Sequence, residues 1–177
     1  MIEVRAAAML AAGLIAVPGV PMVAADWLLS ESQDESPGLD THVSLVTDDG
    51  FEIDVAVPPG WQVSNAGDSA VLRTDGALVL IDVHDRSGRD PRAIAQRLAR
   101  INRVQGINTA LDGGQIATDD DTLTGDTCVA VSANNRTGPC AYIADDDVVV
   151  GVVALGSPDH SAPPLSDIVG SITRTQP

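Results

Sequence analysis

The chain has 177 residues, of which 44% are apolar, so it contains enough hydrophobic material for one ordinary folded domain and is not expected to be disordered as a whole. Its ten basic residues are all arginines and stand against 25 acids, which gives a formal charge of −15. A charge this negative repels phosphate groups, so the composition excludes nucleic acid as an expected partner.

The first 25 residues have the pattern of a secretory signal peptide. Arg5 precedes an apolar stretch, and Val23-Ala24-Ala25 supplies the small residues expected before a cleavage site. The alternative is an N-terminal anchor, because residues 6–25 approach the ~20 residues that cross a bilayer. We expect a secreted or cell-envelope protein that is attached to the membrane only if this segment is uncleaved. The acidic, serine-rich residues 26–41 are predicted to form a flexible linker.

Cys128 and Cys140 are the two cysteines of the chain. A lone pair in an exported protein is more economically a disulfide than a metal site, which usually needs four ligands. The spacing also differs from the Cys-x-x-Cys of redox proteins. A hairpin centred near Asn134 would place the two cysteines opposite each other on adjacent strands.

Two hairpins are predicted after the linker, because Asp48-Asp49-Gly50 and Asp75-Gly76 each separate two runs with strand-like composition. Pro58-Pro59-Gly60 ends the second run, and the ring of Trp61 is expected to cover one end of the core. The four predicted strands are residues 42–47, 51–57, 69–74 and 77–85.

One long helix is predicted over about 91–104. Asp90 can accept hydrogen bonds from free backbone amides, Pro91 suits the first helical position, and Gly106 is the matching stop. One face of this helix is apolar and should be buried. The residues expected on this buried stripe are Ile94, Leu98 and Ile101.

The rest of the chain is predicted to form five strands and a short helix at about 164–172, which Pro163-Pro164 introduces. The segment 148–155 is almost entirely apolar, so it should be a central strand covered on both faces, with helices on both sides of the sheet. The fold class is therefore α+β, with an antiparallel sheet of about six to eight strands. The five strands are residues 107–111, 115–118, 126–133, 139–145 and 148–155.

Early hairpin strands that end in the Val57-Pro58-Pro59-Gly60-Trp61 turn, the Asp90-Pro91 helix, a strand meander and a closing helix follow one another over residues 42–174. This succession resembles the PsbP-like fold and is most similar to the LpqN-type secreted proteins of actinobacteria. The resemblance implies a non-enzymatic accessory or binding domain of the cell envelope. Those relatives are typically lipid-anchored, and the lack of a cysteine near residue 25 departs from that pattern.

Residues that could carry chemistry do not form a known constellation. Gly67-Asp68-Ser69 resembles the nucleophile block of SGNH hydrolases, but Asp159 has the wrong spacing to His160 for the Asp-x-x-His of that family. His42 and His84 are scattered singly. We therefore expect no enzyme, and assign no catalytic residue, cofactor or metal.

Two acidic triplets, Asp119-Asp120-Asp121 and Asp145-Asp146-Asp147, have two interpretations. They could hold Ca²⁺ through clustered carboxylates, although neither fits the twelve-residue calcium loop. The favoured alternative is that they make turns by bonding their own backbone.

Arginines are concentrated between residues 86 and 103, where Asp90 is the only acid. The segment is either a solvated face neutralised by nearby aspartates, or a docking face for an acidic envelope protein or an anionic lipid headgroup. The candidate docking residues are Arg86, Arg89, Arg92, Arg97, Arg100 and Arg103. Arg92, Arg100 and Arg103 should lie opposite the buried stripe of the helix.

Two functions remain. The first is an accessory domain that acts through protein–protein docking. The alternative is a carrier of a small apolar or lipid ligand in a cavity between helix and sheet, which few aromatics and small core residues would permit. A co-purifying mass in native mass spectrometry would support the carrier.

Overall fold

The computed structural model describes residues 42–175, which form two antiparallel sheets and two helices, an α+β fold. The predicted signal peptide and the predicted linker lie outside the described residues. The elements are β1 (His42–Val46), β2 (Glu52–Ala56), β3 (Gln62–Asn65), β4 (Ser69–Thr74), β5 (Ala77–Asp85), α2 (Pro91–Val104), β6 (Ile107–Ala117), β7 (Thr124–Ser132), β8 (Thr137–Ala144), β9 (Val148–Gly156), α3 (Leu165–Gly170) and β10 (Thr173–Thr175).

The large sheet has seven strands in the order β3-β4-β5-β9-β8-β7-β6, which confirms the prediction of six to eight antiparallel strands. A second sheet of three strands, β1-β2-β10, was not predicted. Its last strand is three residues long and places Thr173 opposite Asp54. Because this pairing joins the two ends of the domain, no local sequence pattern indicates it.

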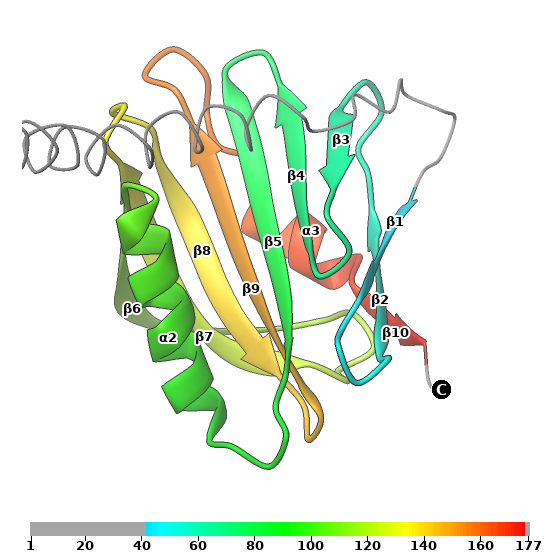
Figure 1. The fold of residues 1–177 in the computed structure, drawn as a ribbon. Coiled ribbons are helices and arrows are strands. Elements are labelled where there is room, and N and C mark those ends of the chain that lie inside the picture. The colour runs from blue at the N-terminus through cyan, green and yellow to red at the C-terminus, as the bar shows by residue number, and fades with distance from the viewer. Residues whose placement is uncertain (1–41, 176–177) are drawn as a thin grey trace, which may run out of the picture. The chain divides into compact units, whose positions relative to one another are not determined.

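Strand β9 is the central, fourth strand of the large sheet, and all of its residues are buried, as its apolar sequence predicts. Alternate side chains point to the two faces, so Val150 and Val152 join a core with β1, β2 and α3, whereas Val149 and Val153 join a core with α2. Figure 1 shows α2 in front of the sheet and α3 behind it. The two helices therefore flank opposite faces, as predicted.

The two predicted hairpins form around Gly50 and Gly76, which have φ angles of 88° and 80°. Trp61 packs half-buried against the core shared with β1, β2 and α3, as expected. The following residues, Gln62–Asn65, form strand β3, which was not predicted because this short polar segment lies at the sheet edge.

The prediction of separate strands at 107–111 and 115–118 is wrong. They are parts of the single strand β6, which pairs with β7 throughout and shifts its register between Leu111 and Gln115. Gly113, with a φ of 83°, makes the chain bulge there without reversing its direction. A glycine pair inside a strand therefore gave a bulge where a turn had been expected.

Helix α2 spans the predicted residues 91–104, and the Asp90 carboxylate accepts a hydrogen bond from the Arg92 amide at 2.9 Å. Ile94 and Leu98 are buried as predicted, but Ile101 is 40% exposed. Asn102 is buried in its place. The buried residues Ile94, Leu98 and Asn102 are spaced four apart, and residues at this spacing move gradually around the helix axis. Ile101 therefore lies at the side of the contact with the sheet.

The short final helix α3 is Leu165–Gly170, two residues shorter at its end than predicted. The Ser171 hydroxyl donates to the Ile168 carbonyl at 2.7 Å and ends the helix, and the chain then enters β10. Leu165, Ile168 and Val169 are buried, so α3 contributes one apolar face to the core behind the sheet.

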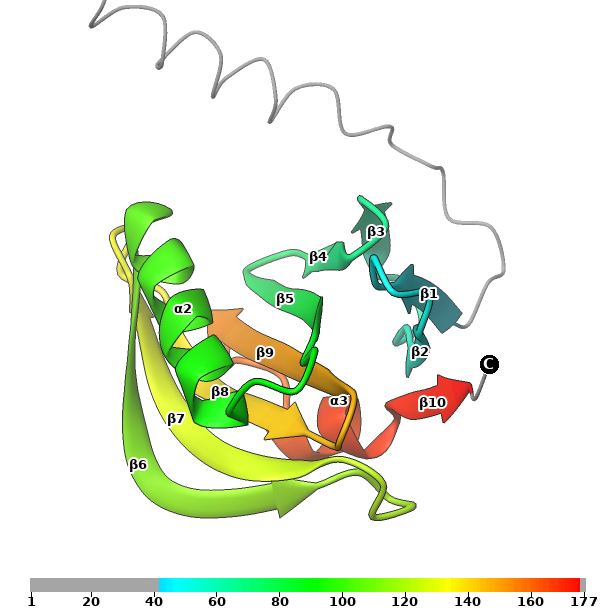
Figure 2. The same ribbon diagram turned by 60° about the horizontal axis from the view of Figure 1, so that its bottom comes forward.

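Strands β6 and β7 curl around α2, as Figure 2 shows. Two glycines stand where neighbouring strands of the large sheet approach too closely for a side chain. A Cβ atom on Gly125 would lie 1.9 Å from the Tyr142 carbonyl oxygen, and one on Gly138 would lie 2.1 Å from the Ala154 carbonyl oxygen. The curled half of the sheet forms a concave face opposite the helix.

Candidate ligand-binding cavity

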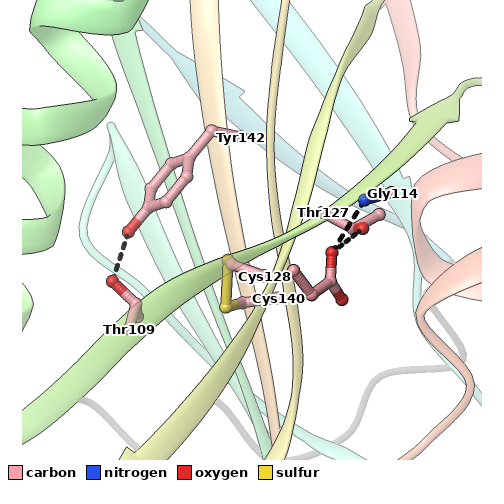
Figure 3. Close-up of a disulfide and its surroundings, with 7 residues drawn as sticks. Thr109, Gly114, Thr127, Cys128, Cys140 and Tyr142 are labelled. Atoms are coloured by element: carbon pink, nitrogen blue, oxygen red, sulfur yellow. Dashed lines mark hydrogen bonds between the residues drawn. A yellow bond between two sulfur atoms is a disulfide. The ribbon is translucent and has the colours of Figure 1, made fainter.

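The two cysteines form a disulfide between β7 and β8, as predicted. They stand directly opposite each other in the β7–β8 ladder, with their Cα atoms 4.8 Å apart. Both are buried and belong to the core under α2, with Tyr142 close by on β8 (Figure 3). The disulfide therefore cross-links the concave part of the sheet.

A cavity of about 440 Å³ lies between α2 and this concave face. Most of its surface is apolar. Ala95 and Ala99 on the helix and Ala144 on β8 end at Cβ, so these side chains leave the space between helix and sheet unfilled. Its lining residues are Pro91, Arg92, Ala95, Gln96, Ala99, Thr109, Leu111, Thr124, Gly125, Asp126, Cys128, Tyr142, Ala144 and Val149.

A few polar groups interrupt the apolar wall. The hydroxyls of Tyr142 and Thr109 are 3.3 Å apart and share a hydrogen bond across β7 (Figure 3). This bond satisfies the polar end of the one tyrosine in the chain and fixes its ring beside the cavity. Two charged residues also line the cavity, Asp126 on β7 and Arg92 on α2.

The sequence predicts a cavity only as an alternative, and no residue is assigned to it from the sequence, although Arg92 and Cys128 are named there in other roles. Asp126 could have been noticed, because it lies on the same face of β7 as the buried Cys128 and Ala130. An acid in that alternating series is unusual on a face that packs against a helix. The concavity of β6 and β7 has no comparable local signal.

Three of the six candidate docking arginines lie near carboxylates. Arg86 is largely buried, contacts Asp146 at 3.2 Å and donates to the backbone carbonyls of Arg89 and Asp145. Arg89 and Arg97 line a second cleft of about 470 Å³ whose wall holds four acids. These acids are Asp48, Asp49, Asp68 and Asp85. This part of the segment fits the interpretation as a face neutralised by aspartates.

The other three arginines are exposed on α2, and Arg100 and Arg103 lie on the side opposite its buried residues, as predicted. Arg92 lines the apolar cavity, whereas the Arg100 Nε donates to the Gln96 carbonyl one turn earlier at 3.2 Å. Among residues 42–175, neither Arg100 nor Arg103 takes part in an ion pair. The six arginines therefore do not form one continuous face: Arg86, Arg89 and Arg97 lie near carboxylates, Arg92 lines the apolar cavity, and Arg100 and Arg103 are on the outer side of α2.

The first acidic triplet forms a turn through the side chain of Asp120. The Asp120 carboxylate accepts from the Thr118 and Thr122 hydroxyls at 2.6 and 2.7 Å and from the Thr122 amide at 3.1 Å. These bonds, that from Thr118 foremost, lower the pKa of Asp120. The turn interpretation is confirmed for this triplet.

The second triplet is also a turn, and it holds the last strand of the domain. The Asp145 carboxylate accepts from the amides of Asp147 and Val148 at 2.7 and 2.8 Å. The Arg174 guanidinium pairs with Asp145 and, at 2.7 Å, with Asp147. Its carbon also lies 4.8 Å from the centre of the Phe51 ring. The carboxylates therefore fasten β10 to the β8–β9 turn.

The hydrolase-like residues do not come together. Ser69 begins β4 and pairs with Asp82, while His160 packs against Gly76 at the turn where β4 ends. The His160 ring nitrogen Nδ1 is instead 3.3 Å from the Ser157 hydroxyl in a tight turn. Within residues 42–175, no three His, Cys, Asp or Glu side chains are grouped to hold a metal ion.

No known protein-family model and no curated protein matches the chain. Neither α2 nor α3 is long and apolar enough to cross a membrane. The resemblance to the PsbP-like fold remains a prediction, as does docking through the arginines.

Proposed function

We propose that this domain is a non-enzymatic module that binds a small apolar ligand in the cavity between α2 and the concave face of the large sheet. The observation that carries the proposal is the cavity itself, whose volume of about 440 Å³ and predominantly apolar wall are those of a small-molecule site. Such sites measure about 300–1,000 Å³ and combine an apolar wall with a few polar groups that orient the ligand.

Cross-links between the strands on the sheet side of the cavity, which we call the cavity floor, support this function. The disulfide joins β7 to β8 below the cavity, and the hydrogen bond between Tyr142 and Thr109 links β8 to β6. Three strands of the wall are thereby held in place before a ligand arrives. A preformed site loses less conformational entropy on binding, which raises affinity.

Two alanines on α2 allow a matched test. Ala99 lines the cavity, whereas Ala93 is exposed on the same helix and does not line it. Ala99→Phe should place a ring in the cavity and sharply reduce the fluorescence increase of a neutral apolar dye such as Nile red, while Ala93→Phe should leave it unchanged. Equal dye binding by both variants, with unchanged melting temperatures, would refute the proposal.

Native mass spectrometry of the protein purified from its own host gives a second test. A co-purifying mass that is present in the wild type and absent from Ala99→Phe would identify the natural ligand. The proposal also includes an extracytoplasmic location, because a buried disulfide is typical of oxidising compartments. Signal-peptide cleavage predicts a mature protein that begins near Asp26, which N-terminal sequencing checks.

Docking is the second candidate function. It is favoured by the outer face of α2, where Arg100 and Arg103 are exposed beside Val104, a side chain that is 90% exposed. Forked guanidinium donors suit an anionic lipid headgroup. Sedimentation with phosphatidylglycerol vesicles should decrease when Arg100 and Arg103 are both changed to Glu, and unchanged sedimentation would exclude this candidate.

A further inference from the structure

Resting on the proposed function, we propose that the ligand carries an ammonium group, which pairs with the Asp126 carboxylate in the cavity wall. Asp126 lies on the face of β7 that turns toward α2, two residues before Cys128. It stands directly opposite Tyr142 in the β7–β8 ladder, and both residues line the cavity.

The Asp126 carboxylate has no protein partner in the described part of the chain. Among residues 42–175 it takes part in no ion pair and no side-chain hydrogen bond, although it is partly withdrawn from solvent. Asp145, in contrast, binds two amides and a guanidinium. The Asp126 oxygens keep contact with solvent at the edge of the apolar wall, so a cation that enters the cavity can reach them and form a charge-assisted hydrogen bond.

The neighbours of Asp126 suit a cationic amine. Tyr142 presents an aromatic ring to the same cavity, and aromatic faces attract ammonium groups. The apolar surface of Leu111, Cys128 and Ala99 would receive the hydrocarbon part of the ligand. The formal charge of the chain, −15, also raises the local concentration of cations.

Arg92 is the other charged residue of the cavity wall and would attract an anionic ligand. We expect this attraction to be weaker than that of Asp126 for a cation. Arg92 is exposed on the first turn of α2, where a long flexible side chain can extend into water. An anionic ligand in the cavity would meet the fixed carboxylate of Asp126, since that residue stands on the sheet.

Three probes with one hydrocarbon chain separate these charges: octylammonium, octanol and octanoate, each used at pH 7 to displace Nile red. Octylammonium should bind about tenfold more tightly than octanol, because its charged hydrogen bond to Asp126 is formed in an apolar site. Asp126→Asn should remove this preference and leave octanol binding within about twofold, since the apolar contacts remain. The control Asp75→Asn, an equal loss of charge at an exposed hairpin turn, should keep it.

The outcomes distinguish this inference from the proposed function. Equal binding of the three probes, or a preference for ammonium that Asp126→Asn retains, would overturn the inference and leave the apolar site standing. A preference for octanoate that Arg92→Gln abolishes would overturn it in favour of an anionic ligand. If Nile red itself does not bind, the proposed function fails and the inference fails with it.

Discussion

Removing the disulfide between Cys128 and Cys140 should cause a large loss of stability, in which the entropic part and the packing part can be measured separately. The bridge is buried, joins two residues that face each other in the β7–β8 ladder, and closes a sequence separation of 12 residues. Two perturbations break it. One is reduction of the wild type in denaturant followed by refolding under reductant, and the other is the double variant Cys128→Ala/Cys140→Ala.

The expected magnitude follows from this sequence separation. In the chain-entropy account, a cross-link that closes a loop of this size lowers the entropy of the unfolded chain by an amount that stabilises the folded state by about 3 kcal/mol. The alanine variant also loses two buried sulfur atoms, which adds a packing loss of about 1 kcal/mol. Domains of this kind are stable by about 5–15 kcal/mol in total, so either perturbation removes a substantial share.

Urea unfolding at pH 7, followed by circular dichroism, measures both effects. We expect the free energy of unfolding to fall by about 3 kcal/mol for the reduced wild type and about 4 kcal/mol for the double variant. The m-value should rise in both, because an unfolded chain without the cross-link exposes more surface.

A loss below about 1 kcal/mol in the reduced wild type, with an unchanged m-value, would refute the reasoning. The β7–β8 hairpin would then restrict the unfolded chain by itself, so the cross-link would add little. A reduced protein that is as stable as the oxidised one would also weaken the argument that the disulfide makes the cavity floor rigid.

Three further predictions concern stability. Leu98 is only 3% exposed, so Leu98→Ala should lower the free energy of unfolding by about 3 kcal/mol, whereas Ile101 is 40% exposed and Ile101→Ala should lower it by under about 1 kcal/mol. Equal losses for the two variants in urea unfolding would contradict the assignment of the buried stripe. Asp145→Asn removes a partly buried charge beside a guanidinium and should cost about 1–2 kcal/mol. Asp146→Asn, at a fully exposed side chain, should leave the free energy of unfolding unchanged in the same assay. Burial raises the pKa of Asp82, so the folded state binds its proton more tightly and this residue destabilises the fold as pH rises through its raised pKa. Asp82→Asn should therefore raise the melting temperature at pH 7, with a gain that shrinks toward pH 4; a gain that grows on acidification would contradict this sign.

Local patterns in the sequence identify most of the fold. Asp90 and Pro91 mark the start of α2, Asp-Gly pairs mark two hairpins, and an uninterrupted apolar run marks the central strand β9. The disulfide could also be predicted from the sequence, because two cysteines placed symmetrically about one turn face each other in an antiparallel ladder. These features depend on neighbouring residues, and the sequence records neighbours directly.

Features that depend on distant segments needed the tertiary structure. Strand β10 exists because Arg174 reaches Asp145 and Asp147 and because Thr173 pairs with Asp54, and both contacts join the end of the chain to earlier segments. The bulge in β6 and the exposure of Ile101 follow from how strand and helix meet their partners.

The candidate cavity also depends on segments that are distant in the sequence. It arises where alanines on α2 stand opposite the concave face of β6, β7 and β8, and no short segment contains both sides. The amino-acid sequence thus determined most of the elements, the cross-link and the excess of acid, since these follow from local pattern and composition. Only the packing of helix against curved sheet decided that a space would remain between them and that Asp126 would line it.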